Sequence, residues 1–459
     1  MDARPCRESP LPSGERSTCE RKRASRVRGH DPIERSTPPH PIPLPAGERE
    51  QAERAESSCI NSGGKPSKER VLIAGAGPVG LTAAANLVRR GVPVTVFEAG
   101  DDLSAQSRAS TFHPPTLDML DELGAAGDLM AQGLVAPRFQ YRSKQHGVLG
   151  QFDFGTIADA CRHPFRLQCE QSRLTRILHD RLCGHPAFAI EFGARVADVN
   201  QDGGGVCITT ERGGGRETHA GLWLIGADGA RSDVRRALAV EFPGFTWPER
   251  FLVVSTPFDF FSVIPDLVSV SYVADPKRWQ FLLQIPGLWR VMFPIAAHES
   301  DEEALSPGFA QALMAGIVPG VRDYEIAHTT LYKVHQRVAK TFRHGRAFLA
   351  GDAAHINNPL GGMGMNGGVH DAMNLTTRLA DVWHGRAPES DLDRYDKQRR
   401  LVTLEAIEQQ SIQNKRNLES DGAEFGQRLS HIATDERRTY DYLLRVSMVA
   451  SLRRAEELG

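Results

Sequence analysis

The feature that most constrains the fold is a glycine-rich turn set between two short apolar runs. Residues 71–74 are continuously apolar, as expected for a strand buried in a parallel sheet. Residues 75–80 (Gly-Ala-Gly-Pro-Val-Gly) fit the pattern GxGxxG, and residues 81–90 continue with helical apolar spacing. A second apolar run, 92–97, ends at Glu98. The order of strand, glycine turn, helix and strand predicts a Rossmann-type βαβ unit.

Each glycine of this turn has a predicted task in binding a dinucleotide. Gly75 permits the tight turn, Gly77 lets the backbone approach a pyrophosphate, and Gly80 lets the helix pack closely on the strand. Free amide groups and the positive end of the helix dipole would hold the pyrophosphate. Glu98 follows at a separation of about 20 residues, where an acidic side chain accepts hydrogen bonds from ribose hydroxyls. The unit predicts a dinucleotide site and leaves NAD and FAD both open.

The composition bounds the class of protein. A chain of 459 residues is long enough for two domains. Its charged fraction is 24% and its net charge is −2, so nothing draws the whole protein toward nucleic acid or an anionic membrane. The sequence has no apolar run of about 18 residues, and its first residues lack the apolar core of a secretory signal. We therefore expect a cytoplasmic protein with no membrane span and no nucleic-acid partner.

The cysteines and histidines show no metal-binding pattern. The seven cysteines include no CxxC pair, and their odd number is typical of reduced thiols in a cytosolic protein of this size. His355 and His370 are too far apart to share one helical face. The sequence therefore predicts no disulfide framework and no metal site.

Residues 1–69 differ in composition from the rest of the chain. They are rich in Pro, Arg, Glu and Ser and have almost no aliphatic periodicity. Such a segment cannot bury enough apolar surface to offset the entropy lost on ordering, so we expect a disordered N-terminal extension. A basic arm, an Arg-rich targeting peptide and an extension that the working protein does not need all remain open as its role.

Two later segments carry aspartate-containing turns directly after apolar runs. Residues 222–227 lead into an Asp-Gly turn at 228–229. Residues 347–350 form another buried-strand pattern that ends in Gly-Asp at 351–352. A loop rich in glycine, 359–368, then leads into a helical pattern.

These motifs, in this order, resemble those of the group A flavoprotein aromatic hydroxylases, the family of para-hydroxybenzoate hydroxylase and salicylate hydroxylase. The resemblance runs from Val71 to about Arg400 and implies FAD as the bound cofactor. In that family the Gly-Asp carboxylate hydrogen-bonds the ribityl chain of FAD, which implies this role for Asp352. The family's Asp-Gly turn, here Asp228 and Gly229, is implicated in handling both FAD and NAD(P)H.

The glycine-rich loop implies where the flavin ring lies. By resemblance, Gly361 to Asn366 lie beside the ring, at a helix N-terminus whose dipole would stabilise negative charge on the reduced flavin. Arg108 looks like the family's arginine that contacts FAD, and Gln171 looks like the glutamine that opens a helix over the cofactor. Each of these two also fits an ordinary surface arginine or helix-start residue. The cofactor-binding residues expected on this basis are Gly75, Ala76, Gly77, Pro78, Val79, Gly80, Glu98, Arg108, Gln171, Asp228, Gly229, Gly351, Asp352, Pro359, Gly361, Gly362, Met363, Gly364, Met365 and Asn366.

Some residues depart from the family pattern. Met363 stands where many members have Gln, and Gln398 stands where a Tyr-x-x-Glu-Arg-Arg motif usually has Glu. Asn357 and Asn358 are polar residues at the expected substrate edge of the flavin. These differences leave the subfamily open.

Between residues 242 and 340 the pattern changes to alternating strands. Two apolar runs on either side of a Pro-Gly pair, 286–287, indicate a hairpin. The resemblance implies an antiparallel sheet that roofs a substrate pocket over the flavin. Tyr272, Gln284 and Arg290 are candidates to face that pocket, although each also fits an ordinary sheet residue.

The expected architecture is α/β, a Rossmann-like FAD-binding domain with an interleaved antiparallel-sheet substrate domain and C-terminal helices. We expect the FAD-binding domain at 70–241 and 341–390 and the substrate-binding sheet domain at 242–340. The C-terminal helices are expected at 391–459 and the disordered extension at 1–69.

The resemblance implies an enzyme, an FAD-dependent monooxygenase that uses NAD(P)H and O₂ to hydroxylate an aromatic or conjugated ring through a flavin C4a-hydroperoxide. The flavin carries this chemistry, so no catalytic acid or base is named. A single GxGxxG indicates that NAD(P)H binds only transiently as reductant. A flavin-dependent reductase or dehydrogenase on the same scaffold, and a non-catalytic FAD-binding interaction protein, remain alternatives. The expected partners are a small aromatic substrate and O₂, and the oligomeric state is open, with a homodimer as one candidate.

Overall fold

The computed structural model describes residues 69–106, 109–419 and 423–458. Of the expected N-terminal extension only Glu69 is among them, so the prediction for residues 1–69 otherwise lies outside the described residues. The predicted FAD contact Arg108 lies outside them as well.

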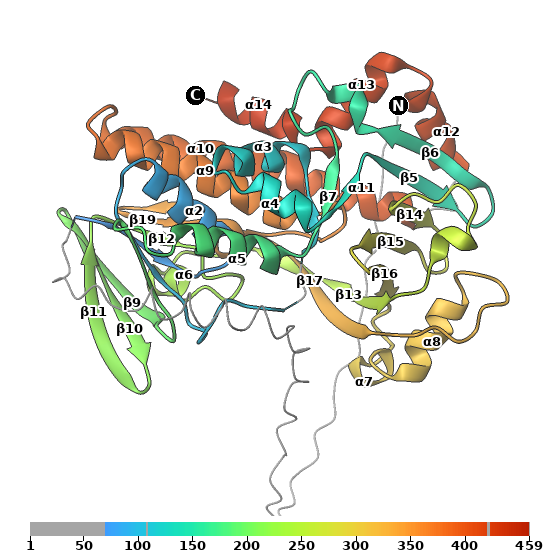
Figure 1. Cartoon of the computed structure of the whole chain (residues 1–459), viewed down its shortest axis with the longest axis horizontal. Helices are drawn as coiled ribbons and strands as arrows, with labels where there is room; N and C mark the ends of the chain where they lie inside the picture. The colour runs from blue at the N-terminus through green and yellow to red at the C-terminus, as the bar shows by residue number, and fades with distance from the viewer. Residues whose placement is uncertain (1–68, 107–108, 420–422, 459) are drawn as a thin grey trace, which may run out of the picture. The chain divides into compact units, whose positions relative to one another are not determined.

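A six-stranded sheet has its strands in the order β18-β19-β12-β1-β2-β8, of which β12 and β19 are labelled in Figure 1. Every neighbouring pair is parallel except the edge pair of β18 and β19. All residues of β1, β2 and β12 are buried, as in parallel sheets covered on both faces. The strands are β1 (Val71–Ala74), β2 (Val94–Phe97), β8 (Phe188–Glu191), β12 (Trp223–Gly226), β18 (Arg343–His344) and β19 (Ala347–Leu349).

The predicted βαβ unit is present, with a later start to its second strand. Helix α2 (Pro78–Arg89) follows the glycine turn, and Gly91 has a φ of +77° just after the helix ends. The strand was expected from residue 92 but begins at Val94. Pro93 has no N–H for a sheet ladder, and the N–H of Val92 donates to the carbonyl of Leu87, 2.9 Å away, at the end of the helix.

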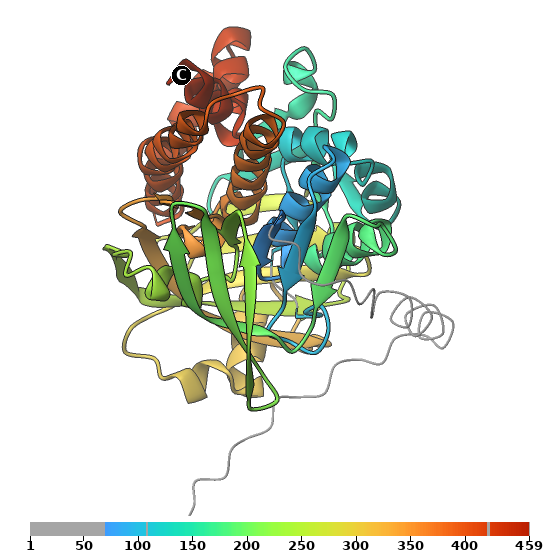
Figure 2. The ribbon, with the colours of Figure 1, turned by 90° about the vertical axis from the view of Figure 1, so that its left-hand side faces the viewer.

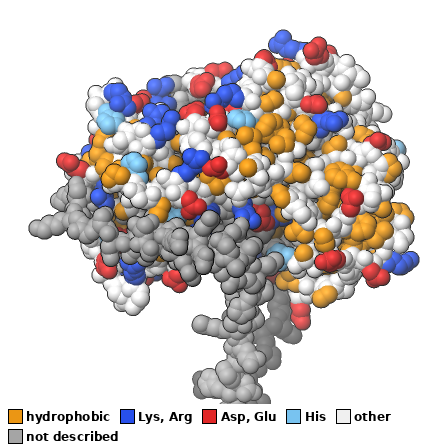
Figure 3. All heavy atoms as spheres, viewed as in Figure 1, with side chains coloured by type: hydrophobic (Ala, Val, Ile, Leu, Met, Phe, Trp, Pro, Cys, Tyr) orange, Lys and Arg blue, Asp and Glu red, His pale blue; other side chains and the backbone are white. Residues whose placement is uncertain are grey.

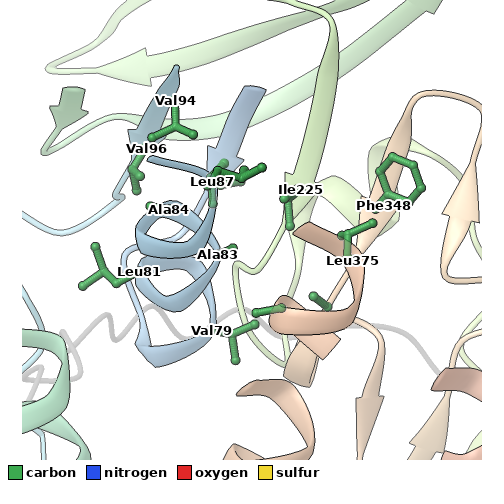
Figure 4. Packing of buried hydrophobic residues seen from close by; sticks show 14 of the residues in the cluster. Val79, Leu81, Ala83, Ala84, Leu87, Val94, Val96, Ile225, Phe348 and Leu375 are labelled. Carbon is green, nitrogen blue, oxygen red and sulfur yellow. The ribbon is translucent and has the colours of Figure 1, made fainter. Parts of the chain in front are cut away.

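Helix α9 (Met363–Trp383) lies beside α2, although almost 300 residues of chain separate them (Figure 4). Asn86 Nδ2 donates to Thr376 Oγ1 at 2.8 Å, which joins the two buried helix faces. Val79, Leu87, Ile225, Phe348 and Leu375 belong to one hydrophobic core with the strands beneath. The other helices of this part of the chain are α3 (Pro114–Glu122), α4 (Ala126–Ala131), α5 (Gln171–Leu182) and α6 (Asp233–Ala237).

Two three-stranded sheets accompany the parallel sheet. One has the order β11-β10-β9 and is the green sheet nearest the viewer in Figure 2. Its strands are β9 (Arg195–Asp202), β10 (Gly205–Arg212) and β11 (Gly215–Gly221). The other has the order β3-β7-β4, with β3 (Thr111–Phe112), β4 (Leu134–Ala136) and β7 (Arg166–Gln168).

The predicted antiparallel sheet is present and has eight strands in the order β20-β17-β13-β16-β15-β14-β5-β6. The expected hairpin is β15 paired with β16. The sheet extends beyond the expected range 242–340, because β5 and β6 join it through a parallel pairing of β5 with β14 that no local pattern encodes. Its strands are β5 (Arg138–Ser143), β6 (Gly147–Asp153), β13 (Gly244–Thr256), β14 (Val270–Ala274), β15 (Gln280–Ile285), β16 (Leu288–Ile295), β17 (His328–Val338) and β20 (His355–Ile356).

Side chains of this large sheet contribute to two hydrophobic clusters. One cluster includes Trp289 and Val291 together with Met314 of a short helix. The other includes Tyr272, Phe425 and Leu443, and it covers the sheet with C-terminal helices. The helices concerned are α7 (Asp301–Ala304) and α8 (Pro307–Ala315) for the first cluster, and α12 (Ala423–Ala433) and α13 (Glu436–Val446) for the second. The remaining C-terminal helices are α10 (Asp393–Val402), α11 (Glu408–Leu418) and α14 (Val449–Glu457).

These elements confirm the expected α/β fold class, with a Rossmann-like part, an antiparallel sheet and C-terminal helices. On the face seen in Figure 3, acidic and basic side chains are interspersed, and hydrophobic side chains are more frequent on its right-hand half. Within the described ranges, no helix combines the length and apolar character needed to cross a bilayer.

Candidate functional site

Four of the predicted motifs meet at one edge of the parallel sheet. Gly75, Glu98, Asp228 and Gly351 each follow a strand, and these strands are parallel neighbours, so their carboxyl ends share one edge. Backbone hydrogen bonds continue the ladder into the turns: the N–H of Gly75 donates to the carbonyl of Phe97 at 2.8 Å. Ligands of open α/β sheets bind at this edge. We call this group of turns the edge site.

The three glycines of the first turn face different surroundings. Gly75 has a φ of +97°, and a Cβ there would lie 2.5 Å from the carbonyl oxygen of Ala227. A Cβ at Gly80 would lie 2.0 Å from the carbonyl oxygen of Gly75, whereas a Cβ at Gly77 would meet nothing within 4 Å. The turn and packing roles of Gly75 and Gly80 are therefore confirmed. The open space at Gly77 is where the predicted pyrophosphate contact would be made, and that contact stays a prediction.

Glu98 stabilises the glycine turn from the neighbouring strand. Its carboxylate accepts hydrogen bonds from the N–H of Ala76 at 2.7 Å and from the N–H of Gly100 at 2.9 Å. The side chain thus lies against the turn, where a ribose next to the pyrophosphate would also lie. Its predicted contact with ribose hydroxyls stays a prediction.

Asp228 organises the start of helix α6. Its carboxylate accepts from the hydroxyl of Ser232 at 2.6 Å and from the N–H of Val234 at 3.0 Å, while Ser232 Oγ caps the helix by accepting from the N–H of Arg235. Burial raises the pKa of the Asp228 carboxyl, and these hydrogen bonds oppose the rise. Gly229 follows with a φ of +79° and open space around it. The turn is therefore held rigid by its own side chains.

The second glycine-rich segment is held against strand β3. Gly361 and Gly362 have φ values of +102° and +68°, and Gly362 is the N-cap of α9. Asn366, expected beside the flavin, accepts from the N–H of His113 at 2.9 Å and donates to the carbonyl of Thr111 at 2.8 Å. The side chain of Asn366 therefore fixes the loop on its support. Pro359 is exposed, Gly364 is half-buried, and Met363 and Met365 are buried.

A buried carboxylate network that the sequence did not reveal supports the same segment. Asp371 accepts from the N–H of Gly351 at 3.0 Å, from His355 Nε2 at 2.7 Å and from Arg399 Nε at 2.7 Å. Arg399 also donates to the carbonyl of Gly367 at 3.2 Å. Burial alone would raise the pKa of Asp371, but His355 and Arg399 hold it well below its usual range. The network connects the Gly-Asp turn, helix α9 and helix α10.

Tyr395 explains part of the Tyr-x-x-Gln-Arg-Arg segment. Its buried hydroxyl donates to the carbonyl of Leu349, 2.6 Å away at the end of β19. Arg399, four residues later, reaches Asp371 from the same helix. The segment therefore holds the end of β19 and the Asp371 network in place. Gln398, at the position of the family's Glu, accepts hydrogen bonds from Asn374 and Arg378.

Several buried polar atoms near the edge site have no hydrogen-bond partner among the described residues. Buried polar groups in proteins are normally paired, so such a group of atoms fits a site that a polar cofactor completes. Asp352, the predicted ribityl contact, is exposed at the same edge. The unpaired atoms are Nδ1 of His113, His355 and His370, Oδ1 of Asn357 and Nδ2 of Asn358.

The three predicted substrate residues lie on three neighbouring strands of the large sheet, β14, β15 and β16. Tyr272 is buried and stacks on Phe281, with ring centroids 4.5 Å apart. Gln284 is half-buried and accepts from Ser269 Oγ at 3.1 Å. Arg290 is buried and forms an ion pair with Glu170, the residue before Gln171 at the start of α5. Their contact with a substrate stays a prediction.

A cavity of about 350 Å³ lies among helices α11, α12 and α13. Asn414, Phe425 and Tyr442 are part of its lining. Asn414 Nδ2 also donates to the carbonyl of Leu360 at 3.4 Å, so the cavity adjoins the glycine-rich segment. The cavity is therefore the candidate place for a substrate next to the edge site.

Two expectations about cysteines and metals concern other regions. Cys161, Cys169 and Cys207 carry free thiols, and for these three cysteines the expectation of reduced thiols holds. The potential ligand atoms of three residues on β8 and β11 lie within 4.8 Å of one another, and the expectation of no metal site stays a prediction. These residues are Glu191, Glu217 and His219.

Known proteins match most of the chain. Residues 68–410 match the family described as FAD binding domain. The chain is 36% identical over 339 residues to the para-nitrophenol 4-monooxygenase of Pseudomonas sp. (strain WBC-3). The aligned region covers 73% of this chain and 83% of that relative. It is 34% identical over 357 residues to 6-hydroxy-3-succinoylpyridine 3-monooxygenase of Pseudomonas putida (strain DSM 28022 / S16), which covers 76% of this chain and 89% of that relative. The crystal structure of p-nitrophenol 4-monooxygenase from Pseudomonas putida DLL-E4 matches with a TM-score of 0.79 and 30% identity, and covers 85% of this chain and 99% of that one.

Proposed function

Because the chain belongs to the family of group A FAD-dependent aromatic hydroxylases, we propose that its edge site holds FAD and serves the hydroxylation of a single ring that carries a hydroxyl group. The chain is an FAD-dependent aromatic monooxygenase that uses NAD(P)H as reductant and O₂ as co-substrate. The observation that carries the proposed site is the convergence of four motif turns on one edge of the parallel sheet.

The residues of the edge site have complementary roles in this proposal. The turn at Gly77 and the N-terminus of α2 bind the pyrophosphate, and Glu98 binds the ribose. Asp352 binds the ribityl chain, and the segment from Gly361 to Asn366 lies beside the flavin ring, where the N-terminus of α9 favours negative charge. FAD, when bound, supplies the redox chemistry and the activation of O₂. The protein's own part is to orient the ring and to exclude water.

The proposed substrate class rests on the relatives and on the cavity. The two named relatives act on para-nitrophenol and on 6-hydroxy-3-succinoylpyridine, and each of these names describes one six-membered ring with a hydroxyl group. The cavity of about 350 Å³ adjoins the glycine-rich segment through Asn414. We place the substrate ring there, with Tyr272, Gln284 and Arg290 as candidates to contact it or to shape its surroundings. A cytoplasmic location and a homodimer belong to the same proposal.

The test uses the full chain loaded with FAD. Oxidation of NADH and of NADPH is followed in air with a panel of 4-nitrophenol, phenol, 4-hydroxybenzoate, salicylate and nitrobenzene, and products are identified by mass. We expect at least one hydroxylated ring to accelerate oxidation of the nicotinamide and to gain one oxygen atom, and nitrobenzene to do neither. Fast oxidation of the nicotinamide with no oxygenated product across the panel would favour the reductase alternative.

A further inference from the structure

Arg166 is a buried cation without a carboxylate partner. The residue lies in β7 and is 3% exposed. Among the described residues, no ion pair joins its guanidinium to an aspartate or glutamate, whereas the buried Arg290 pairs with Glu170. A buried charge is costly unless it is paired. The structure therefore holds a positive charge in the interior that its own described side chains leave unneutralised.

The hydrogen bonds of Arg166 are few and long. One terminal nitrogen donates to the hydroxyl of Tyr272 and the other to the carbonyl of Val446, each at 3.5 Å, and Nε has no partner. A guanidinium has five N–H donors, and good N–H···O bonds are about 2.9 Å long. The rings of Phe139 and Phe154 lie 4.8 and 5.4 Å from the guanidinium carbon. Most of the donor capacity of Arg166 is therefore unused.

By contrast, Arg235 has the Asp228 carboxylate nearby but no direct ion pair among the described residues, and short hydrogen bonds satisfy its guanidinium. It donates to the carbonyl of Ala353 at 2.7 Å and to the carbonyl of Ala230 at 2.9 Å. Its guanidinium carbon also lies 3.8 Å from the centre of the ring of Phe242. Arg166 lacks such short bonds, which sets it apart from a purely structural arginine.

Three tyrosine side chains extend from Arg166 toward the cavity. Tyr141 and Tyr272 stack with ring centroids 5.1 Å apart, and the hydroxyl of Tyr442 donates to that of Tyr141 at 3.2 Å. Burial raises the pKa of Tyr442 to about 12, and it raises that of Tyr141 well above its usual range. Tyr141 and Tyr442 therefore keep their protons at neutral pH, and Tyr141, which accepts the proton of Tyr442, can donate its own O–H to an anion.

The cluster adjoins the cavity on one side and the support of the glycine-rich segment on the other. Tyr442 and Phe425 both line the cavity. The ring centroids of Phe425 and Tyr141 lie 5.0 Å apart. Arg166 lies on β7, which pairs with β3, and β3 leads into His113. His113 Nε2 hydrogen-bonds the carbonyl oxygen of Gly361 at 2.8 Å. An anion that reached the tyrosine hydroxyls from the cavity would thus be near the glycine-rich segment.

We propose that Arg166 and the hydroxyls of Tyr141, Tyr272 and Tyr442 form an oxyanion-binding site that selects a negatively charged aromatic substrate, through a phenolate or a carboxylate oxygen. The proposal rests on the proposed function and specifies that the substrate ring carries a negative charge. The Tyr272 hydroxyl lies 3.5 Å from a terminal nitrogen of Arg166, so an oxyanion bound at that hydroxyl can also accept a charge-assisted hydrogen bond from the guanidinium. Selection for charge follows because a neutral ring leaves Arg166 unpaired.

Binding to the oxidised, FAD-loaded full chain without reductant tests the site separately from turnover. The probes are 4-nitrophenol above the pKa of its phenol, benzoate, and neutral nitrobenzene, with affinity measured by calorimetry. We expect at least one anion to bind about 10- to 100-fold more tightly than nitrobenzene, and the preference to disappear in Arg166→Gln. The anion that shows the preference identifies phenolate or carboxylate as the selected group.

Two further variants keep the test decisive. Arg437→Gln removes a highly exposed arginine of the same helix α13 that lies outside the cavity lining, and it should leave the preference unchanged. Tyr272→Phe removes one hydroxyl without changing the ring, and it should weaken anion binding even if Arg166→Gln does not fold. Equal binding of anions and nitrobenzene, or a preference that survives both Arg166→Gln and Tyr272→Phe, would overturn the inference. Arg166-dependent anion binding without any hydroxylated product would instead count against the proposed function.

Discussion

At the scale of single residues, Asp371 supports the edge site through three hydrogen bonds made by one fully buried carboxylate. One carboxylate holds a backbone N–H of the Gly-Asp turn, a histidine and an arginine, all without exposure to solvent. Such a group has little freedom to relax when one partner is lost. Its contribution should therefore be visible both in stability and in FAD binding.

Replacing Asp371 by Asn should destabilise the protein by about 3–5 kcal/mol, because the change leaves Arg399 buried without a counter-charge. The affinity for FAD should fall as well, since Gly351 loses a bond that fixes its turn. Denaturant unfolding and FAD titration measure the two effects. Asp381→Asn on the same helix removes a more exposed ion pair with Arg386 and should cost no more than about 1 kcal/mol. Equal effects of the two substitutions would contradict this account.

His370 makes the free energy of unfolding depend on pH, and the direction of this dependence follows from its pKa. Burial, together with the nearby Arg399, lowers the pKa of His370 to about 3. The unfolded chain binds a proton on this ring below about pH 6.5, and the folded protein does not until the pH is far lower. The free energy of unfolding should therefore fall as the pH drops below about 6.5, by up to ~1.4 kcal/mol per pH unit from this residue.

In His370→Gln this pH dependence should become shallower, while a side-chain amide can still bond Thr116 Oγ1, which lies 3.0 Å from His370 Nε2. Unfolding measured between about pH 5 and pH 7.5 checks the slope. His146→Gln alters an exposed histidine and should leave the slope as it is. A slope that is the same in His370→Gln and the parent protein would show that another group titrates.

At the scale of elements, two glycines at the junction of β1 and α2 have different roles, one in packing and the other in binding FAD. A Cβ at Gly80 would lie 2.0 Å from a backbone oxygen, so Gly80→Ala should force the helix away and cost about 1–3 kcal/mol. A Cβ at Gly77 meets nothing within 4 Å, so Gly77→Ala should fold normally but bind FAD less tightly. Unfolding of the apoprotein and FAD titration distinguish the two. If Gly77→Ala binds FAD as tightly as the parent protein does, the pyrophosphate does not bind at this turn.

The elements also show what the sequence could and could not predict. The unit from β1 to β2 was predictable because its signals, apolar runs and a glycine turn, are local. The pairing of β5 with β14 was not, because it joins strands that lie about 130 residues apart in the chain through backbone contacts that no local pattern specifies.

The same reason applies to the supporting residues of the site. Nothing in the local sequence distinguishes Asp371, Arg399 and Arg166 from ordinary residues of a helix or a strand. Only the fold brings them to the glycine-rich segment or to the cavity. Asn366 was expected at the flavin from the resemblance, but its bonds to Thr111 and His113 depend on a strand more than 250 residues earlier.

At the scale of the whole molecule, one part of the chain suits the cofactor and another suits the substrate ring. The parallel sheet and its edge site suit a dinucleotide cofactor, and the large sheet with the C-terminal helices provides the cavity and the tyrosine cluster. Arg290 with Glu170, and Asn414 with Leu360, join the two parts. Cofactor and ring must therefore bind to the same protein, and an oxygen atom activated at the cofactor must reach the ring.

The most direct test is isotopic. The FAD-loaded full chain is given NAD(P)H, the hydroxylated ring that stimulates its oxidation, and O₂ labelled with ¹⁸O, and the product is examined by mass spectrometry. We expect one labelled oxygen atom in each product molecule, and no label when only the water carries ¹⁸O. A product without label, or nicotinamide oxidation that yields only hydrogen peroxide, would contradict the assignment as a monooxygenase.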